Sequence, residues 1–77
     1  MTEQANGTEV VIYTHPDCEF SAAAKYDMEQ LGIAFREVDV TVVPGAVEEL
    51  ERLTGGDRVT PVIVEGERVT IGYGGLG

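Results

Sequence analysis

Hydrophobic and polar positions along the chain predict strands and helices in alternation, followed by a hairpin. Residues 8–14 have a continuous apolar centre, which is typical of a strand covered on both faces, so we expect this strand at the centre of the sheet. Residues 19–31 follow the helical period, and Gly32 comes where a left-handed cap would end the helix. Residues 34–40 alternate less cleanly, but their length and β-branched ending favour a second strand.

The second half of the chain predicts another helix and two short strands. Residues 43–54 keep the helical period, Pro44 suits a first turn, and a Gly-Gly pair at 55–56 stops the helix. Two apolar runs joined by the turn at residues 65–67 form a hairpin. The order β-α-β-α-β-β predicts an α/β fold with a four-stranded mixed sheet, in which the first two strands are parallel through a right-handed crossover and the last two are antiparallel.

Composition limits the chain to one small domain. Its 77 residues can bury one modest core and offer only a shallow site. The polar start does not resemble a secretory signal, and no apolar run is long enough to span a membrane. A single cysteine permits no intramolecular disulfide and gives too few ligands for structural zinc, so a reducing cytoplasm is the expected compartment.

The charge of the chain argues against polyanionic partners. Fourteen acidic residues against five basic ones give a net charge of −9. Nucleic acids and anionic membranes attract cationic surfaces, so we expect neither as a partner. Such an acidic surface is typical of a very soluble protein, and also of proteins from a salty cytosol.

The only cysteine, Cys18, lies where the first strand passes into the first helix. Pro16 and Asp17 are turn and cap residues, which places Cys18 at the N-cap or in the first turn. Free backbone N–H groups and the positive end of the helix dipole stabilise a thiolate there. A lone cysteine is more often a small buried side chain, but the turn before this one predicts exposure. We therefore interpret Cys18 as a reactive nucleophile.

The strand, the turn, the Cys18-x-x-Ser21 motif and the helix, followed later by Val59-Thr60-Pro61 and by Ile71-Gly72, resemble a glutaredoxin. The resemblance covers nearly the whole chain and implies a small thioredoxin-like fold. It suggests a flexible N-terminal tail over residues 1–7 and a glutaredoxin-like domain over 8–77. One departure concerns the fold, because the glycine-rich end of the chain does not favour the C-terminal helix that usually closes the family's domain.

The resemblance implies roles for residues on both sides of Cys18. The motif is of the monothiol kind, with Ser21 where dithiol members carry a second cysteine. Ser21 could donate a hydrogen bond to the thiolate or serve only as a polar first-turn residue. His15 could lower the pKa of Cys18 or contact a ligand carboxylate, and it could equally be a solvated turn residue. Phe20 could form an apolar wall of the groove or lie in the core.

A second group of implied site residues surrounds Pro61. From the residues alone, a trans proline at a strand edge is the simpler interpretation. The resemblance implies instead a cis Thr60–Pro61 bond facing Cys18, with the backbone of Val59 or Thr60 free to pair with a bound peptide-like thiol. Gly72 matches the first glycine of a family motif that binds a ligand carboxylate. The second glycine is replaced, and an acidic residue expected after it is missing, so we expect weak use of glutathione.

Three functions remain open from the sequence. The first is monothiol thiol–disulfide exchange by a monomer, in which Cys18 transfers a low-molecular-weight thiol, such as glutathione, from disulfide or glutathionylated proteins to a second thiol. The second is [2Fe–2S] carriage by a dimer, with Cys18 of each chain and two small thiols as ligands, and no metal site in the monomer. Glu19 stands where the cluster-carrying class has glycine, so we place this second. The third is a non-catalytic binding or regulatory domain.

Overall fold

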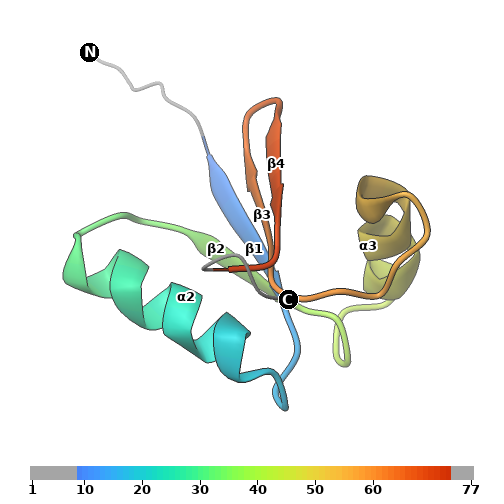
Figure 1. Ribbon diagram of the computed structural model, residues 1–77, viewed down its shortest axis with the longest axis horizontal. Coiled ribbons are helices and arrows are strands. Elements are labelled where there is room, and N and C mark those ends of the chain that lie inside the picture. Colours follow the sequence, from blue (N-terminus) through green and yellow to red (C-terminus); the bar gives the residue numbers. More distant parts are fainter. Residues whose placement is uncertain (1–8, 74–77) are drawn as a thin grey trace.

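The protein is a four-stranded sheet with one helix on each side (Figure 1). The computed structural model describes residues 9–73. The elements follow the chain in the order β1 (Val10–Thr14), α2 (Glu19–Gln30), β2 (Arg36–Asp39), α3 (Ala46–Thr54), β3 (Val62–Glu65) and β4 (Arg68–Ile71). This is the predicted β-α-β-α-β-β order.

The sheet has the strand order β2-β1-β3-β4. β1 pairs with β2 in parallel and with β3 in antiparallel, and β3 and β4 form the antiparallel hairpin. The predicted mixed sheet with β1 in a central position is therefore confirmed. β1 takes this place because its side chains are apolar in both directions, as a strand covered on both faces requires.

Two apolar clusters, one on each face of the sheet, form the core. Val11 of β1 packs with Leu50 of α3 on one face, and Ile12 packs with Ala24 of α2 on the other. Successive side chains of a strand point to opposite faces, so this single strand supplies both clusters. The two helices are thereby fixed on opposite sides of β1.

Two helix boundaries differ from the prediction. α3 begins at Ala46 rather than at 43, because Gly45 adopts a left-handed φ of +81° as its N-cap and leaves Pro44 outside the helix. The helix predicted over residues 19–31 ends at Gln30, and Leu31 is its C-cap and is 74 % exposed. The apolar face of α2 therefore ends at Met28, which packs against the sheet.

Some predictions fall on residues outside the described range of 9–73. These are the flexible tail at 1–7 and the final residues of the glycine-rich end; Gly72 and Tyr73, which are described, are not helical. Neither of the helices in the described part of the chain has the length and apolar character needed to cross a bilayer.

Candidate functional site

The candidate site lies at the carboxyl ends of the parallel strands β1 and β2. His15 follows β1 and Val40 follows β2, and the pairing continues past both strands, because the Val40 N–H donates to the Thr14 carbonyl at 3.0 Å. The chain then turns through Pro16 and Asp17 into α2, whose N-cap is Cys18. The Cys18 N–H donates to the His15 carbonyl at 3.0 Å, which closes this turn. The predicted placement of the thiol at a helix N-terminus is confirmed.

The cis-proline segment lies against the thiol. The Thr60–Pro61 bond is cis, as the resemblance implied. The Cys18 thiol donates a hydrogen bond to the Thr60 carbonyl at 3.2 Å, although the two residues are 42 positions apart in the chain. Cys18 is half-buried, so one side of the sulfur packs on this segment while the other remains open.

The surroundings of Cys18 favour its thiolate form. Burial raises the pKa of the thiol, but hydrogen bonds from the side chains of Ser21 and Thr60 and from the backbone N–H groups of Ser21 and Phe20 outweigh burial, so that the pKa is lowered. The donors are neutral groups of the first turn and the proline segment. A lowered thiol pKa increases the fraction of the nucleophilic thiolate at neutral pH.

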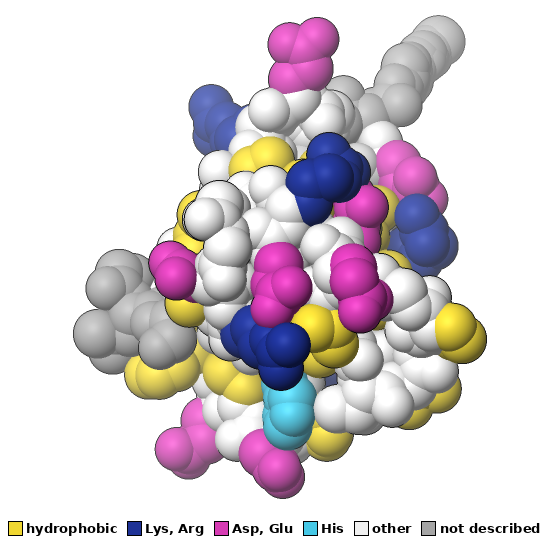
Figure 2. All heavy atoms as spheres, turned by 90° about the vertical axis from the view of Figure 1, so that its right-hand side faces the viewer, with side chains coloured by type: hydrophobic (Ala, Val, Ile, Leu, Met, Phe, Trp, Pro, Cys, Tyr) yellow, Lys and Arg dark blue, Asp and Glu magenta, His cyan; other side chains and the backbone are white. Residues whose placement is uncertain are grey.

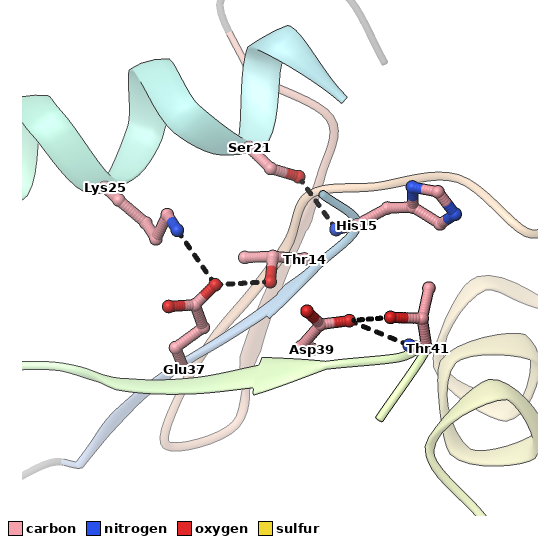
Figure 3. A network of polar contacts seen from close by, with 7 residues as sticks. All are labelled: Thr14, His15, Ser21, Lys25, Glu37, Asp39 and Thr41. Carbon is pink, nitrogen blue, oxygen red and sulfur yellow. Dashed lines mark hydrogen bonds and ion pairs between the residues drawn. The ribbon is translucent and has the colours of Figure 1, made fainter. Parts of the chain in front are cut away.

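Ser21 is held in the position from which it can donate to the sulfur. Its side chain is almost fully buried, at 2 % exposure. The Ser21 hydroxyl oxygen accepts a hydrogen bond from the His15 backbone N–H at 3.4 Å (Figure 3). Because its oxygen receives that N–H, its own proton is available to Cys18, whose pKa it lowers.

A pocket of about 500 Å³ opens beside the sulfur. Three of the predicted site residues line it: His15, Cys18 and Thr60. The sequence interpretation missed its apolar wall, which is formed by Val40, Val47 and Leu50. Two charged residues, Asp17 and Arg58, also line the pocket. Arg58 directly precedes Val59-Thr60-Pro61, so from the sequence it could lie at the edge of the groove or in a solvated loop, and the structure places it in the lining.

The missed wall has a signal in the sequence. Val40 follows the second parallel strand, and the carboxyl ends of parallel strands meet at one edge of the sheet, where ligands of α/β proteins usually bind. Val47 and Leu50 lie three positions apart on α3, which places them on one face of that helix. The strand order and the helix period together could have pointed to this wall.

The polar groups at the pocket are held by local contacts. His15 Nδ1 accepts a hydrogen bond from the Asp17 N–H at 3.0 Å, so the proton of the neutral ring lies on Nε2. Arg58 Nε donates to the Glu51 carboxylate at 2.5 Å. Figure 2 shows the only histidine of the chain next to a basic side chain, with acidic side chains above and below this pair.

The sequence pattern of the glutaredoxin family matches residues 10–69. The chain therefore belongs to the glutaredoxin family. The glutaredoxin-like protein NrdH-redoxin from Escherichia coli is 35 % identical, with a TM-score of 0.74 over 84 % of this chain and 83 % of that one. Glutaredoxin from Brucella melitensis is 31 % identical, with a TM-score of 0.67 over 83 % and 68 % of the two chains.

A more distant relative supports the fold alone. The glutaredoxin grx-1 from Archaeoglobus fulgidus has a TM-score of 0.75 over 88 % of this chain and 78 % of that one, at 20 % identity. A search of curated proteins gave no significant match. The expected small thioredoxin-like fold is thus confirmed by the structural relatives, and thiol–disulfide oxidoreductase chemistry is supported at the level of the glutaredoxin family.

Besides Ser21, four residues to which the glutaredoxin resemblance gave roles do not line the pocket. Phe20 and Val59 are half-buried and Pro61 is buried, all outside the pocket lining. The Gly72 N–H donates to the Pro61 carbonyl at 2.8 Å, so this amide already has a partner within the fold. Their roles in binding a thiol remain predictions.

A network of polar contacts connects the strands and the helix that carry this glutaredoxin site. Glu37 of β2 accepts hydrogen bonds from the buried Thr14 hydroxyl at 2.7 Å and from Lys25 of α2 at 2.9 Å (Figure 3). Hydrogen bonds from Lys25 and then Thr14 lower the pKa of Glu37. The carboxylate therefore joins α2 to the end of β1, two of the elements that position Cys18.

Proposed function

We propose that this protein is a monothiol thiol–disulfide oxidoreductase that exchanges mixed disulfides through Cys18. The observation that carries the proposal is the half-buried thiol at the N-cap of α2, whose pKa is lowered by Ser21 and Thr60 and which borders a pocket. The lowered pKa supplies the thiolate, and the pocket admits a second sulfur. Ser21 cannot form a disulfide, so a low-molecular-weight thiol must complete the cycle.

The reaction consists of two exchanges. The Cys18 thiolate attacks the small-thiol sulfur of a mixed disulfide between a protein and a low-molecular-weight thiol. That disulfide bond breaks, and the protein sulfur leaves as a thiolate that takes a proton from water. A second small thiolate then attacks the small-thiol sulfur bound to Cys18, which releases Cys18 as a thiolate. One protein thiol is formed, and the two small thiols leave joined as a disulfide.

We propose that glutathione is a weak co-substrate. The support is the Gly72 N–H, which is bonded to the Pro61 carbonyl, together with the replacement of the second family glycine by Tyr73. The structure of the Escherichia coli NrdH-redoxin was described as explaining a thioredoxin-like activity profile in a glutaredoxin-like protein. That precedent supports the idea that a glutaredoxin-like chain can have an activity profile unlike that of a glutaredoxin.

We propose that the working form is a monomer in a reducing cytoplasm, with disulfide or glutathionylated proteins as its partners. The support is the single cysteine, since one chain suffices for monothiol exchange. The same count bears on the alternative of cluster carriage, which needs two chains and two added thiols to reach four sulfur ligands. No group of three or more potential metal ligands occurs among residues 9–73.

A turnover assay tests the proposal. The substrate is a cysteine peptide with glutamine neighbours, joined to 2-mercaptoethanol as a mixed disulfide, and excess 2-mercaptoethanol is the reductant. We expect turnover well above the uncatalysed rate, complete loss in Cys18→Ser, and an unchanged rate in Thr70→Ala on the exposed strand β4. At equal thiolate concentration, glutathione should be the slower reductant.

The same preparation distinguishes the alternatives. Wild-type turnover no faster than the uncatalysed reaction would refute the proposed catalysis. After anaerobic reconstitution with iron and sulfide, a brown dimer that bleaches when thiol is removed would instead establish cluster carriage. Fast turnover with glutathione would contradict only the proposal about the co-substrate.

A further inference from the structure

Two carboxylates flank the nucleophile directly. Asp17 precedes Cys18 and lines the pocket, and Glu19 follows it in the exposed first turn of α2. Neither carboxylate forms an ion pair with another residue of the described range 9–73. Their negative charges therefore act on whatever approaches the sulfur.

The basic group nearest to the pocket is already compensated. Arg58 is bonded to the Glu51 carboxylate, and Glu48 of the same helix attracts it as well. Figure 2 shows acidic side chains above and below the histidine and the basic side chain next to it. The open approach to Cys18 is consequently negative, in a chain whose net charge is −9.

Apart from Asp17 and Arg58, the pocket lining consists of His15, Cys18, two threonines and an apolar wall. Val40, Val47 and Leu50 form an apolar wall beside the sulfur, with room for a small organic thiol. When Cys18 attacks the sulfur of that thiol, the departing peptide sulfur is still bonded to it. With the small thiol against the apolar wall, the peptide cysteine and its neighbours would lie outside that wall. The charged residues adjacent to Cys18 in the chain are Asp17, which lines the pocket, and Glu19 in the first turn of α2.

We propose that Asp17 and Glu19 select polypeptide substrates in which lysine or arginine neighbours the disulfide-bonded cysteine. This inference rests on the proposed thiol exchange and names its substrate class. Basic neighbours are attracted to the two carboxylates, while acidic neighbours are repelled as like charges. Selection acts on the encounter between enzyme and substrate, so it weakens as salt is added.

Three substrates test the selection. They are peptides identical except for lysine, glutamine or glutamate on both sides of one cysteine, each joined to 2-mercaptoethanol. The kcat/KM of each is divided by its uncatalysed rate with 2-mercaptoethanol, which removes the effect of the neighbours on the leaving sulfur. At low ionic strength we expect the lysine peptide to exceed the glutamate peptide roughly tenfold. The ratio should approach one in 1 M salt, where the Debye length is about 3 Å.

A pair of charge-matched variants locates the effect. D17N/E19Q should reduce the ratio to about twofold at most, because only long-range charge remains. E65Q/E67Q removes the same number of charges from the β3–β4 hairpin, where Glu65 pairs with Val10 at the opposite end of β1 from Cys18. This control should retain the wild-type ratio. Comparing two substrates on one enzyme cancels any change in the pKa of Cys18.

The outcomes separate the inference from the function beneath it. If the glutamine peptide is turned over in a Cys18-dependent manner but the lysine-to-glutamate ratio is near one, the selection is refuted and the exchange stands. An equal decrease of the lysine-to-glutamate ratio in D17N/E19Q and in E65Q/E67Q would also overturn the selection, since the change in net charge alone would explain it. If none of the three peptides is turned over, the proposed exchange itself fails. The salt dependence of wild type provides a test that needs no variant.

Discussion

Replacing Ser21 by alanine should raise the pKa of Cys18. The hydroxyl donates to the thiolate, and a hydrogen bond to a charged group contributes about 1.5–3 kcal/mol. Cys18 is half-buried, so water can solvate part of the thiolate and the lower end of that range applies. Loss of this hydrogen bond destabilises the thiolate relative to the thiol, so the pKa of Cys18 should rise. Water cannot replace the hydroxyl itself, because Ser21 is 2 % exposed.

The pH dependence of alkylation by iodoacetamide measures this pKa in both proteins. The midpoint should move upward in Ser21→Ala, whereas Thr70→Ala, which removes a hydroxyl from the exposed edge strand, should leave it in place. The His15 N–H loses its acceptor in Ser21→Ala, so thermal unfolding should be recorded to confirm that the variant is folded. An unchanged or lower midpoint in folded Ser21→Ala would refute the role of this hydroxyl in holding the thiolate.

Two further changes probe the structure that supports the site. Because the pKa of Glu37 is lowered in the fold, its ionised form stabilises the protein at pH values above the ordinary pKa of 4.5, and this stabilisation is lost as the pH falls through the lowered pKa. Glu37→Gln should lower the free energy of unfolding by about 1 kcal/mol at neutral pH and should weaken its dependence on pH in the acid range, as measured by urea unfolding. An unchanged dependence on pH would contradict the role of this network. Leu50→Ala in the pocket wall should lower the free energy of unfolding by about 3 kcal/mol, against less than about 0.5 kcal/mol for Leu31→Ala at an exposed position, and equal losses would contradict the assigned burial.

Much of the fold could be predicted because local and global signals agree. The apolar run of β1 indicated a strand covered on both faces, and the order of elements then fixed the parallel and antiparallel pairings. The start of α3 was missed because Pro44 is compatible with a first helical turn, while the left-handed Gly45 delays the helix to Ala46. A sequence shows that glycine can adopt this conformation but not that it does.

The site divides in the same way. Cys18 and Ser21 could be recognised because their chemistry depends on neighbours within one helical turn. The contact between the Cys18 thiol and the Thr60 carbonyl spans 42 positions, and only the family resemblance suggested it. The apolar wall was missed because Val40 and Leu50 line the same pocket as Cys18 only after β2 and α3 have packed on β1. The spacing of these residues along the chain does not show that they lie close together in the fold.

The electrostatics of the site explain how one thiol could be both reactive and selective. A basic neighbour would stabilise the thiolate but would also attract anionic substrates. Here the pKa of Cys18 is lowered by the neutral donors of Ser21, Thr60 and the first turn, which contribute no net charge to the surface. Activation by neutral donors leaves the charge of the approach to be set by Asp17 and Glu19. On this proposal the neutral donors lower the pKa of the sulfur, and the two carboxylates set the sign of the charge on its preferred partner.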